Sequence, residues 1–515
     1  MYIFKLIKLK VRDHDVFKEN IEFDFFQESD HLDTGKPYFT MVLGPNGTGK
    51  SNLLRLLIEI IKVGYEKSLK QPIKKYPKGK YSLEYYLNDG YYTILNTLGY
   101  SSIEAASQGQ DDFNEERGIR LFKDGTEIEF TLSAIPKSIL AVSIMLNDKF
   151  PVFSGNDFSI YNYLGLKRDA NTAGTRSYIT KTVEMVFRAA HKTSFIENTA
   201  ELLKFLELDP NLFISYYPRY KHIFFKGNMT VELMDDFYSD YKKYLNRETE
   251  PWSIGIYKNI KETEPEVIPK LVDLLNYISE RLQPEYEGSR TKFYDFDIFD
   301  TSIDISNHFN YLPYLQRLDL ISYPEIVLQK NGRYFSVENS SSGEYHLIST
   351  IISVLACISE NSLVLVDEPE ISLHPNWQMK YIKFLNQTFK KYRSTHFLIC
   401  SHSHFLVSDL KPENSSILSL YKEGSQIKSS QVLSNTFGWS SESVLYNVFK
   451  VKTTRNHFVE IDVMELVSLL EDQSKDFDSI KVLIEKFESL SLLKEDPLNE
   501  LINEAKNYLA DASTN

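Results

Sequence analysis

Alternating and continuous apolar runs divide the first part of the chain into short strands and one long helix. Apolar and polar residues alternate over Tyr2–Val11 and over Ile21–Phe26, which predicts two strands of a hairpin. Tyr38–Leu43 is a compact apolar run, the pattern of a buried strand. From Ser51 onward, apolar residues recur at helical spacing on one face, comprising Leu53, Leu54, Leu57, Ile58 and Ile61. The order is therefore strand, loop, helix.

The rest of the pattern predicts further regions with different folds. Helical runs such as Thr199–Leu208 and Val267–Leu282 lack the sustained heptads of a coiled coil. Asn331-Gly332 between two apolar runs predicts a tight hairpin. We predict an α/β protein with an antiparallel β subdomain, divided into an N-terminal lobe (1–180), a helical insertion (181–290), a C-terminal lobe (291–430) and an acidic helical partner-binding region (431–515).

Charge and composition restrict the class of protein. The 515 residues carry a formal net charge of −13, which argues against coating nucleic acid with the whole surface but leaves room for a local basic groove. Residues 456–515 hold 14 Asp and Glu against 5 Lys and Arg. No apolar run approaches membrane-spanning length and the N-terminus is no signal peptide, so we expect a soluble cytoplasmic protein without membrane contact. The two cysteines, Cys357 and Cys400, lie in apolar runs and predict buried core positions.

The loop between the buried strand and the helix carries the first candidate chemistry. Residues 44–51 read Gly-Pro-Asn-Gly-Thr-Gly-Lys-Ser, which satisfies G-x-x-x-x-G-K-S. Glycines let successive N–H groups surround phosphate oxygens, Lys50 would meet the β- and γ-phosphates, and Ser51 would bind Mg²⁺. The alternative is a chance glycine turn, which the flanking strand and helix disfavour. The predicted nucleotide-binding residues are Asn46, Gly47, Thr48, Gly49, Lys50, Ser51 and Asn52.

Two carboxylates follow a second buried strand. Leu363–Val366 is continuously apolar and is followed by Asp367-Glu368-Pro369. Ligands bind at the carboxyl ends of parallel strands, so Asp367 is the candidate Mg²⁺ ligand and Glu368 the candidate general base. Taken alone, a solvated acidic turn would fit the pattern equally well.

A serine-rich segment precedes an apolar helix, and a histidine ends a further strand. Ser341, Ser342, Gly343 and Glu344 open the helix Tyr345–Ile358. Ser341 and Glu344 fit an ordinary capping box, yet the same helix start can bind an anion. Thr395–Ser401 predicts a strand beside that of Asp367, and His402 at its end could reach a γ-phosphate. We interpret His404 as non-catalytic, and His374 as a residue that could approach a partner subunit.

These elements, in this order, resemble the heads of ABC-type ATPases. The resemblance covers Walker A (44–51), the signature (341–344), Walker B (363–368), the D-loop (371–375) and the switch histidine, His402. Ser342 and Glu344 depart from the commonest signature and are similar to SMC- and RecF-like members. Asp367–Pro375 looks like the stand-alone bacterial AAA ATPases of anti-phage systems. Asn147–Pro151, Tyr163–Leu166, Phe437–Ser440 and Thr453–Arg455 are similar to Septu-type ATPases, including those attached to retrons.

The resemblance implies a P-loop fold of ABC-head type with ATP and Mg²⁺ as cofactors. Two heads would pair head to tail, as a homodimer or a higher even-numbered oligomer. Each site would take Lys50, Ser51, Asp367, Glu368 and His402 from one chain, and Ser341, Ser342 and Gly343 from the other. A further Mg²⁺ contact, the Q-loop residue, has Gln108, Gln110, Asn147 and Asp148 as candidates.

The leading functional hypothesis is an ATPase that controls a separate effector, an HNH nuclease in Septu-type systems, with DNA or retron nucleic acid as a further partner. The chain itself shows neither an H-N-H zinc arrangement nor a Toprim pattern. The alternative is a RecF- or SMC-like ATPase that binds DNA in repair or maintenance. A third reading is a scaffold that no longer hydrolyses ATP, against which Glu368 weighs.

Overall fold

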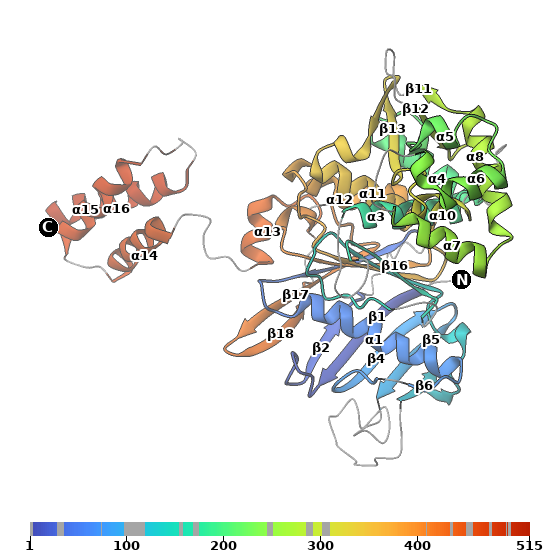
Figure 1. Ribbon diagram of the computed structural model, residues 1–515. Coiled ribbons are helices and arrows are strands. Elements are labelled where there is room, and N and C mark those ends of the chain that lie inside the picture. The colour runs from blue at the N-terminus through green and yellow to red at the C-terminus, as the bar shows by residue number, and fades with distance from the viewer. Residues whose placement is uncertain are drawn as a thin grey trace. The chain divides into compact units, whose positions relative to one another are not determined.

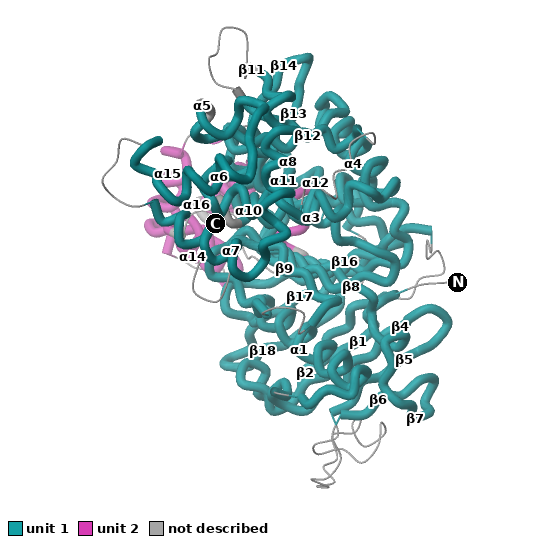
Figure 2. The backbone as a smooth tube through the Cα atoms, turned by 45° about the vertical axis from the view of Figure 1, so that its right-hand side comes forward, with its two compact units in different colours: residues 1–439 teal, residues 440–515 magenta. Residues whose placement is uncertain are grey.

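The computed structural model describes residues 4–27, 35–73, 75–96, 119–153, 158–167, 175–244, 251–284, 292–300, 310–407, 409–432, 436–449, 457–472, 476–490, 492 and 496–514. The chain divides into two compact units, Met1–Trp439 and Ser440–Asn515 (Figure 2). The first unit contains three sheets, and the described part of the second contains helices.

The central sheet of the first unit has seven strands, all parallel except the edge strand β18. Figure 1 labels three of its strands, β16, β17 and β18. Its order is β18 (Gln426–Gln431), β17 (Ser415–Glu423), β3 (Tyr38–Leu43), β16 (Thr395–Ser401), β15 (Ser362–Asp367), β8 (Ser138–Ser143) and β9 (Tyr161–Gly165). Every residue of β3, β8, β15 and β16 is buried, because helices and a second sheet cover both faces. Only Cys400 of the two cysteines follows the prediction of a buried core residue; Cys357, at the end of a helix, is partly exposed.

The register of the parallel strands brings three strand ends together. Ser401 pairs with Leu43, and Asp367 pairs with Cys400 and with Ser143. The residues that follow β3, β15 and β16 therefore leave the sheet at one edge. This places the glycine loop, the two carboxylates and His402 side by side, although about 350 residues separate the first from the last along the chain.

A six-stranded antiparallel sheet and the helix after the glycine loop cover one face. The sheet order is β2 (Ile21–Asp24), β1 (Phe4–Arg12), β4 (Lys80–Leu87), β5 (Gly90–Asn96), β6 (Ile119–Lys123) and β7 (Thr126–Ile128). The hairpin predicted at the N-terminus is confirmed by the antiparallel pairing of β1 and β2. Helix α1 (Lys50–Ser68) shares one hydrophobic core with both sheets, through residues such as Leu57, Leu83 and Leu365.

A third, five-stranded antiparallel sheet belongs to the other lobe. Its order is β11 (Gln283–Pro284), β12 (Lys292–Asp297), β10 (Leu212–Tyr216), β13 (Glu325–Lys330) and β14 (Arg333–Ser336). The predicted tight hairpin is confirmed, since Asn331 and Gly332 both have left-handed backbone angles between β13 and β14. The interval 181–290, predicted as a helical insertion, also contains β10. Both neighbours of β10 lie outside that interval, so no local pattern could reveal the pairing.

Helices on the opposite face include α11 (Ser342–Cys357), which packs against α3 (Thr175–Ala189), and α12 (Pro375–Thr388), which packs against α4 (Thr193–Phe205). Among the described residues of this unit, the other helices are α5 (Lys221–Phe224), α6 (Val231–Ser239), α7 (Ser253–Thr263), α8 (Val267–Glu280) and α10 (Leu312–Arg317), with short 3-10 turns at Leu132–Ala134, Tyr241–Lys243, Val337–Asn339 and His404–Val407.

The second unit contains α13 (Ser441–Asn447), α14 (His457–Glu471), α15 (Phe477–Glu488) and α16 (Leu498–Thr514). The last three share a small core that includes Leu466, Ile480, Phe487 and Ile502. The predicted acidic region was drawn from residue 431, whereas β18 still runs to Gln431 and the unit starts at Ser440. In the described residues, every helix falls short of the length and apolarity that a membrane crossing requires.

Candidate nucleotide site

The glycine loop between β3 and α1 curls around its own lysine. Gly49 caps α1 in the left-handed conformation, at a φ of 86°, and a side chain there would meet Phe17 at 2.8 Å. Lys50 Nζ donates to the carbonyl of Gly44 at 2.9 Å and to that of Pro45 at 3.3 Å. Thr48 Oγ1 also donates to the Pro45 carbonyl, at 2.9 Å. The loop thus presents the start of a 19-residue helix and a buried cation to one point, which suits a phosphate group.

Asp367 is the buried carboxylate of the site. It is 1% exposed, and neither carboxylate oxygen accepts a hydrogen bond of ordinary geometry from the described residues. Burial is the main cause that raises the pKa of Asp367 to about 6; Ser51 and Lys50 act in the opposite direction, and the Glu368 charge adds to the rise. A buried carboxylate with no hydrogen bond of ordinary geometry, together with the neighbouring Ser51 hydroxyl, is a set of oxygen ligands that fits Mg²⁺ held with phosphate oxygens.

Glu368 and His402 stand next to Lys50. His402 Nε2 lies 2.7 Å from Lys50 Nζ and 3.2 Å from Glu368 Oε1. The hydrogen bond from His402 is the first cause that lowers the pKa of Glu368, so the carboxylate is ionised at neutral pH. Glu368 has a left-handed backbone, at a φ of 50°, and its N–H donates to the Cys400 carbonyl at 2.9 Å. Strained backbone of this kind is tolerated where a side chain must be aimed at a site.

Burial also acts on Lys50. It is the largest cause that lowers the Lys50 pKa, and Cys400, Glu368 and Asp367 oppose it. The structure therefore brings together Lys50, Asp367, Glu368 and His402, which come from three separate strand ends. An array of one cation, one ionised carboxylate, one buried carboxylate and one imidazole can bind a polyphosphate and accept a proton from water.

The serine-rich segment is a helix cap. Ser341 accepts from the Glu344 N–H at 3.3 Å, and Glu344 Oε2 accepts from the Ser341 N–H at 3.2 Å. This completes the capping box of α11 that was one of the two readings of the sequence. The predicted anion site at this helix start stays a prediction, and the exposed side chains of Ser341 and Ser342 are compatible with it. Gly343 is buried, and a side chain there would lie 2.4 Å from the Ser372 carbonyl oxygen.

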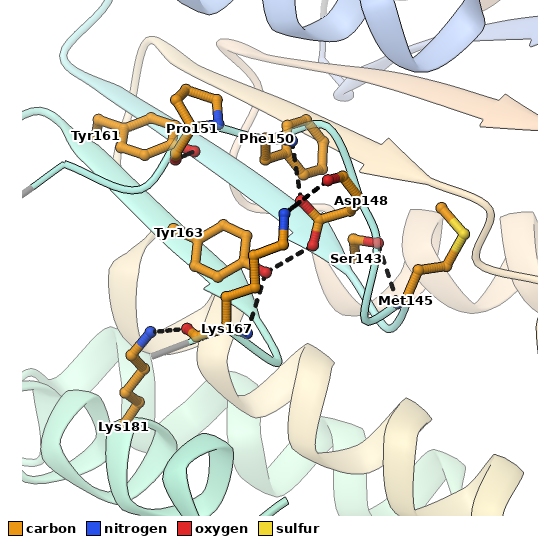
Figure 3. Close-up of polar contacts among 9 residues, drawn as sticks. All are labelled: Ser143, Met145, Asp148, Phe150, Pro151, Tyr161, Tyr163, Lys167 and Lys181. Atoms are coloured by element: carbon orange, nitrogen blue, oxygen red, sulfur yellow. Dashed lines mark hydrogen bonds and ion pairs between the residues drawn. The ribbon is translucent and has the colours of Figure 1, made fainter. Parts of the chain in front are cut away.

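Two of the Q-loop candidates, Gln108 and Gln110, lie outside the described residues. The segment Thr453–Arg455, which is similar to Septu-type ATPases, also lies outside them. Asp148 is fully buried after β8, and its carboxylate is already engaged (Figure 3). It accepts from the Tyr163 hydroxyl at 2.7 Å and from Lys167 Nζ at 3.0 Å. Asn147 is exposed and stays a candidate.

The structure also places His374 and His404, the two other histidines considered from the sequence. His374 caps α12, where its Nδ1 accepts from the Asn376 N–H at 3.3 Å. His404 lies in the 3-10 turn after His402.

One residue was missed by the sequence reasoning. Glu370 Oε1 accepts from the backbone N–H of His402 at 2.6 Å, and therefore ties the loop after β15 to the loop after β16. The sequence does carry a signal for it, because Glu370 is a third acidic residue, two positions after Glu368. Only His374 was considered in this turn.

Comparisons with known proteins add the following. A family model described as AAA ATPase domain matches residues 5–407. The chain is 29% identical to the retron Ec83 probable ATPase of Escherichia coli over 155 residues, 28% of this chain and 27% of that protein. It is 28% identical to the retron Vc95 probable ATPase of Vibrio cholerae serotype O1 biovar El Tor over 132 residues, 24% of this chain and 25% of that protein. The matched stretches thus span about a quarter of each relative.

The solved structures that match this chain include SMC head domains. The Smc head domain of Pyrococcus furiosus has a TM-score of 0.34 at 10% identity, covering 84% of this chain and 96% of that one. The SMC head domain of Thermotoga maritima has a TM-score of 0.32 at 10% identity, covering 84% of this chain and 100% of that one. The fold rests on the strand order and the family match, which confirm the predicted α/β P-loop head with an antiparallel β subdomain.

Proposed function

The chain belongs to the AAA ATPase domain family, and from this premise we propose that it binds ATP with Mg²⁺ and hydrolyses it at the edge of the parallel sheet. The observation that carries the proposal is the convergence of Lys50, Glu368 and His402, with His402 Nε2 within 3.2 Å of Glu368 and 2.7 Å of Lys50. Each of these groups has a distinct part in phosphoryl transfer to water.

The residues divide the work as follows. Backbone N–H groups of Gly47–Lys50 and the Lys50 ammonium bind the phosphates. Ser51 and Asp367 would hold Mg²⁺, which when bound neutralises phosphate charge and orients the terminal group. With ATP bound, His402 donates to a γ-phosphate oxygen, a contact that ADP lacks. This leaves the Glu368 carboxylate, whose pKa is lowered in the nucleotide-free protein, to accept a proton from the attacking water.

A second copy of the chain completes the site in this proposal. The exposed Ser341 and Ser342 at the start of α11 would contact the γ-phosphate bound by a partner head. Two heads would then pair head to tail around two ATP molecules, and hydrolysis would release them. Ligand binding can shift such an equilibrium only through contacts made in the paired state, which the serines supply.

Hydrolysis and pairing can be tested together. Wild type should hydrolyse ATP in the presence of Mg²⁺, and Glu368→Gln should lower kcat by about 10²-fold or more while ATP still binds. In sedimentation velocity, Glu368→Gln with ATP should sediment as a pair, whereas Glu368→Gln combined with Ser342→Arg should stay unpaired. Equal rates for wild type and Glu368→Gln would remove the assignment of the base.

We further propose that the ATPase controls a separate effector through its second unit. Helix α14 exposes Phe458, Ile461 and Met464, which are spaced three residues apart and therefore form one apolar stripe. The surrounding region is acidic, so a partner with an apolar groove and a basic rim fits it by charge. The two retron-named relatives support a place in an anti-phage retron system, where an HNH nuclease is the expected effector and DNA or retron nucleic acid a further expected partner.

The docking surface is tested with a matched pair of substitutions. Ile461→Asp on the stripe should abolish copurification with the proposed effector when the chain is expressed in its native host. Val482→Asp replaces another exposed apolar residue, on α15, and should leave copurification intact. ATP hydrolysis should be unchanged in both variants. Undiminished binding by Ile461→Asp would show that the effector docks elsewhere.

A further inference from the structure

Glu370 joins two loops of the nucleotide site. It lies two residues after Glu368, and its Oε1 accepts from the His402 N–H at 2.6 Å. A carboxylate acceptor makes this contact stronger than a neutral hydrogen bond. Its other oxygen, Oε2, is buried without a hydrogen-bond partner in the described part of the chain. A buried oxygen left unmatched costs free energy, so its position needs a reason beyond stability.

Gln378 on α12 joins the same two loops a second time. Its side-chain N–H groups donate to the carbonyls of Leu373 at 2.9 Å and Glu370 at 3.4 Å. Its Oε1 accepts from the Ser403 hydroxyl at 2.6 Å. One amide therefore reaches the D-loop on one side and the residue after His402 on the other.

The D-loop is in turn pressed against the signature segment. The Cα of Gly343 approaches the Ser372 carbonyl so closely that a side chain could not be accommodated without movement. Ser372 itself has a left-handed backbone, at a φ of 67°. Signature, D-loop and histidine loop thus form a continuous chain of contacts within one subunit: Gly343 to Ser372, then Glu370 and Gln378 to His402 and Ser403.

We propose that Glu370 is a positioning residue for His402, with Gln378 as its second support, and that together they make the histidine loop and the D-loop move as one body. The inference rests on the proposed function and names a regulation of that same site. A histidine that shifts when its γ-phosphate contact forms or breaks would carry the D-loop with it. Since the D-loop would face the partner head, the nucleotide state of one site would reach the subunit interface.

The chain offers a matched control at the other end of the same two strands. Glu360 precedes β15, and its Oε2 accepts from the backbone N–H of Ser394, which precedes β16, at 3.3 Å. Glu360 and Glu370 therefore bridge the same strand pair at opposite ends. Only the bridge at Glu370 lies beside the proposed nucleotide site.

The experiment measures steady-state ATP hydrolysis of the full chain with Mg²⁺, together with the Kd of a fluorescent ATP analogue and the melting temperature. The variants are Glu370→Ala, Glu370→Gln, Glu360→Ala, His402→Ala and the double variant Glu370→Ala/His402→Ala. We expect Glu370→Ala to lower kcat by about 10- to 100-fold, the size of effect that a misplaced catalytic group produces. The Kd should change less than about threefold, because the phosphate loop is untouched. Glu370→Gln keeps an acceptor oxygen and should recover most of kcat.

The double variant decides whether Glu370 acts through His402. If it does, Glu370→Ala/His402→Ala should be no slower than His402→Ala alone, since effects on one unit are not additive. Fully multiplicative losses, or an equal loss of kcat in Glu360→Ala, would overturn the proposal. A wild-type kcat in Glu370→Ala, together with a low kcat in His402→Ala, would also overturn the proposal. If His402→Ala itself had no effect, the proposed catalytic site would fail instead, which is a separate result.

Discussion

The imidazole of His402 and the ammonium of Lys50 are direct neighbours, with Nε2 only 2.7 Å from Nζ. The same nitrogen lies 3.2 Å from Glu368 Oε1. A single ring nitrogen can accept from Lys50 or donate to Glu368, but it cannot do both at once. Lys50 and Glu368 therefore compete for Nε2 of His402 when no γ-phosphate is bound. A γ-phosphate would satisfy Lys50 and His402 as donors and would free the Glu368 carboxylate for water.

Replacing Lys50 by Met should separate folding from ligand binding. Met has a similar length and removes a partly desolvated ammonium, so the melting temperature without nucleotide should change little. Stabilisation by MgATP, about 2.7 kcal/mol at one hundred times Kd, should be lost. Differential scanning fluorimetry with and without MgATP measures both quantities.

The matched control for that experiment is Lys67→Met. Lys67 lies on the same helix, and burial also lowers its pKa, but its Nζ donates to the Ile119 carbonyl, away from the glycine loop. It should keep the full MgATP shift. An equal shift in Lys50→Met and wild type would show that Lys50 does not bind phosphate.

Asp367 predicts a pH-dependent cost in the nucleotide-free protein. Burial raises its pKa from 3.8 to about 6, so between these values the folded state binds more protons than the unfolded state. Stability therefore falls as pH rises from about 4 to about 6, and above that the ionised carboxylate costs on the order of 1–3 kcal/mol. Asp367→Asn should raise the melting temperature at pH 7.5, and the gain should shrink at pH 5.

The same substitution has an opposite effect on ligand binding. Asp367→Asn should lose stabilisation by MgATP, since it removes the proposed Mg²⁺ ligand. A variant that is less stable than wild type at pH 7.5 would contradict the assigned cost of burial.

Gly343→Ala should uncouple the signature from the D-loop. The added methyl would lie 2.4 Å from the Ser372 carbonyl, so one of the two segments must shift. We expect kcat to fall by about tenfold or more, with ATP affinity of the single head nearly unchanged, because the phosphate loop lies elsewhere. Steady-state ATP hydrolysis measures kcat, and equilibrium binding of an ATP analogue measures the affinity.

Gly255→Ala on α7 provides the comparison. A side chain there meets nothing within 4 Å, and alanine favours the helix by about 0.5–1 kcal/mol. It should be active and slightly more stable than wild type. Full activity of Gly343→Ala would mean that the contact with Ser372 relaxes without consequence.

Asp148→Ala distinguishes a structural carboxylate from a metal ligand. Its oxygens accept from Tyr163, Lys167 and the Phe150 N–H, so truncation leaves the buried Tyr163 hydroxyl without its acceptor and removes the charge partner of Lys167, which keeps its bond to the Asp148 carbonyl. We expect a loss of stability of about 3 kcal/mol or more, with the MgATP shift retained. An unchanged melting temperature together with a lost MgATP shift would assign Asp148 to the Q-loop role. Asn147→Ala, at an exposed neighbour, should cost little stability.

The sequence by itself determined the features that depend on a few adjacent residues. Gly49 takes the left-handed backbone that the glycine loop needs before its helix, and Asn331-Gly332 closes a hairpin in which Lys330 pairs with Arg333. The apolar runs before Gly44, Asp367 and His402 predicted buried strands, because such runs occur where a parallel sheet is covered on both faces. These signals are local, since steric limits and burial act on each segment separately.

The tertiary structure decided everything that depends on which distant segments pair. Strand β10 is held by β12 and β13, both outside the interval read as helical. Lys167 and Tyr163 contact the carboxylate of Asp148, a candidate Mg²⁺ ligand, and sheet register places Glu370 beside His402. Such contacts span up to several hundred residues, and their partners are chosen by sheet register and not by local spacing. The phosphate loop could therefore be predicted from the sequence, whereas the contacts that position Glu368 and His402 beside it could not.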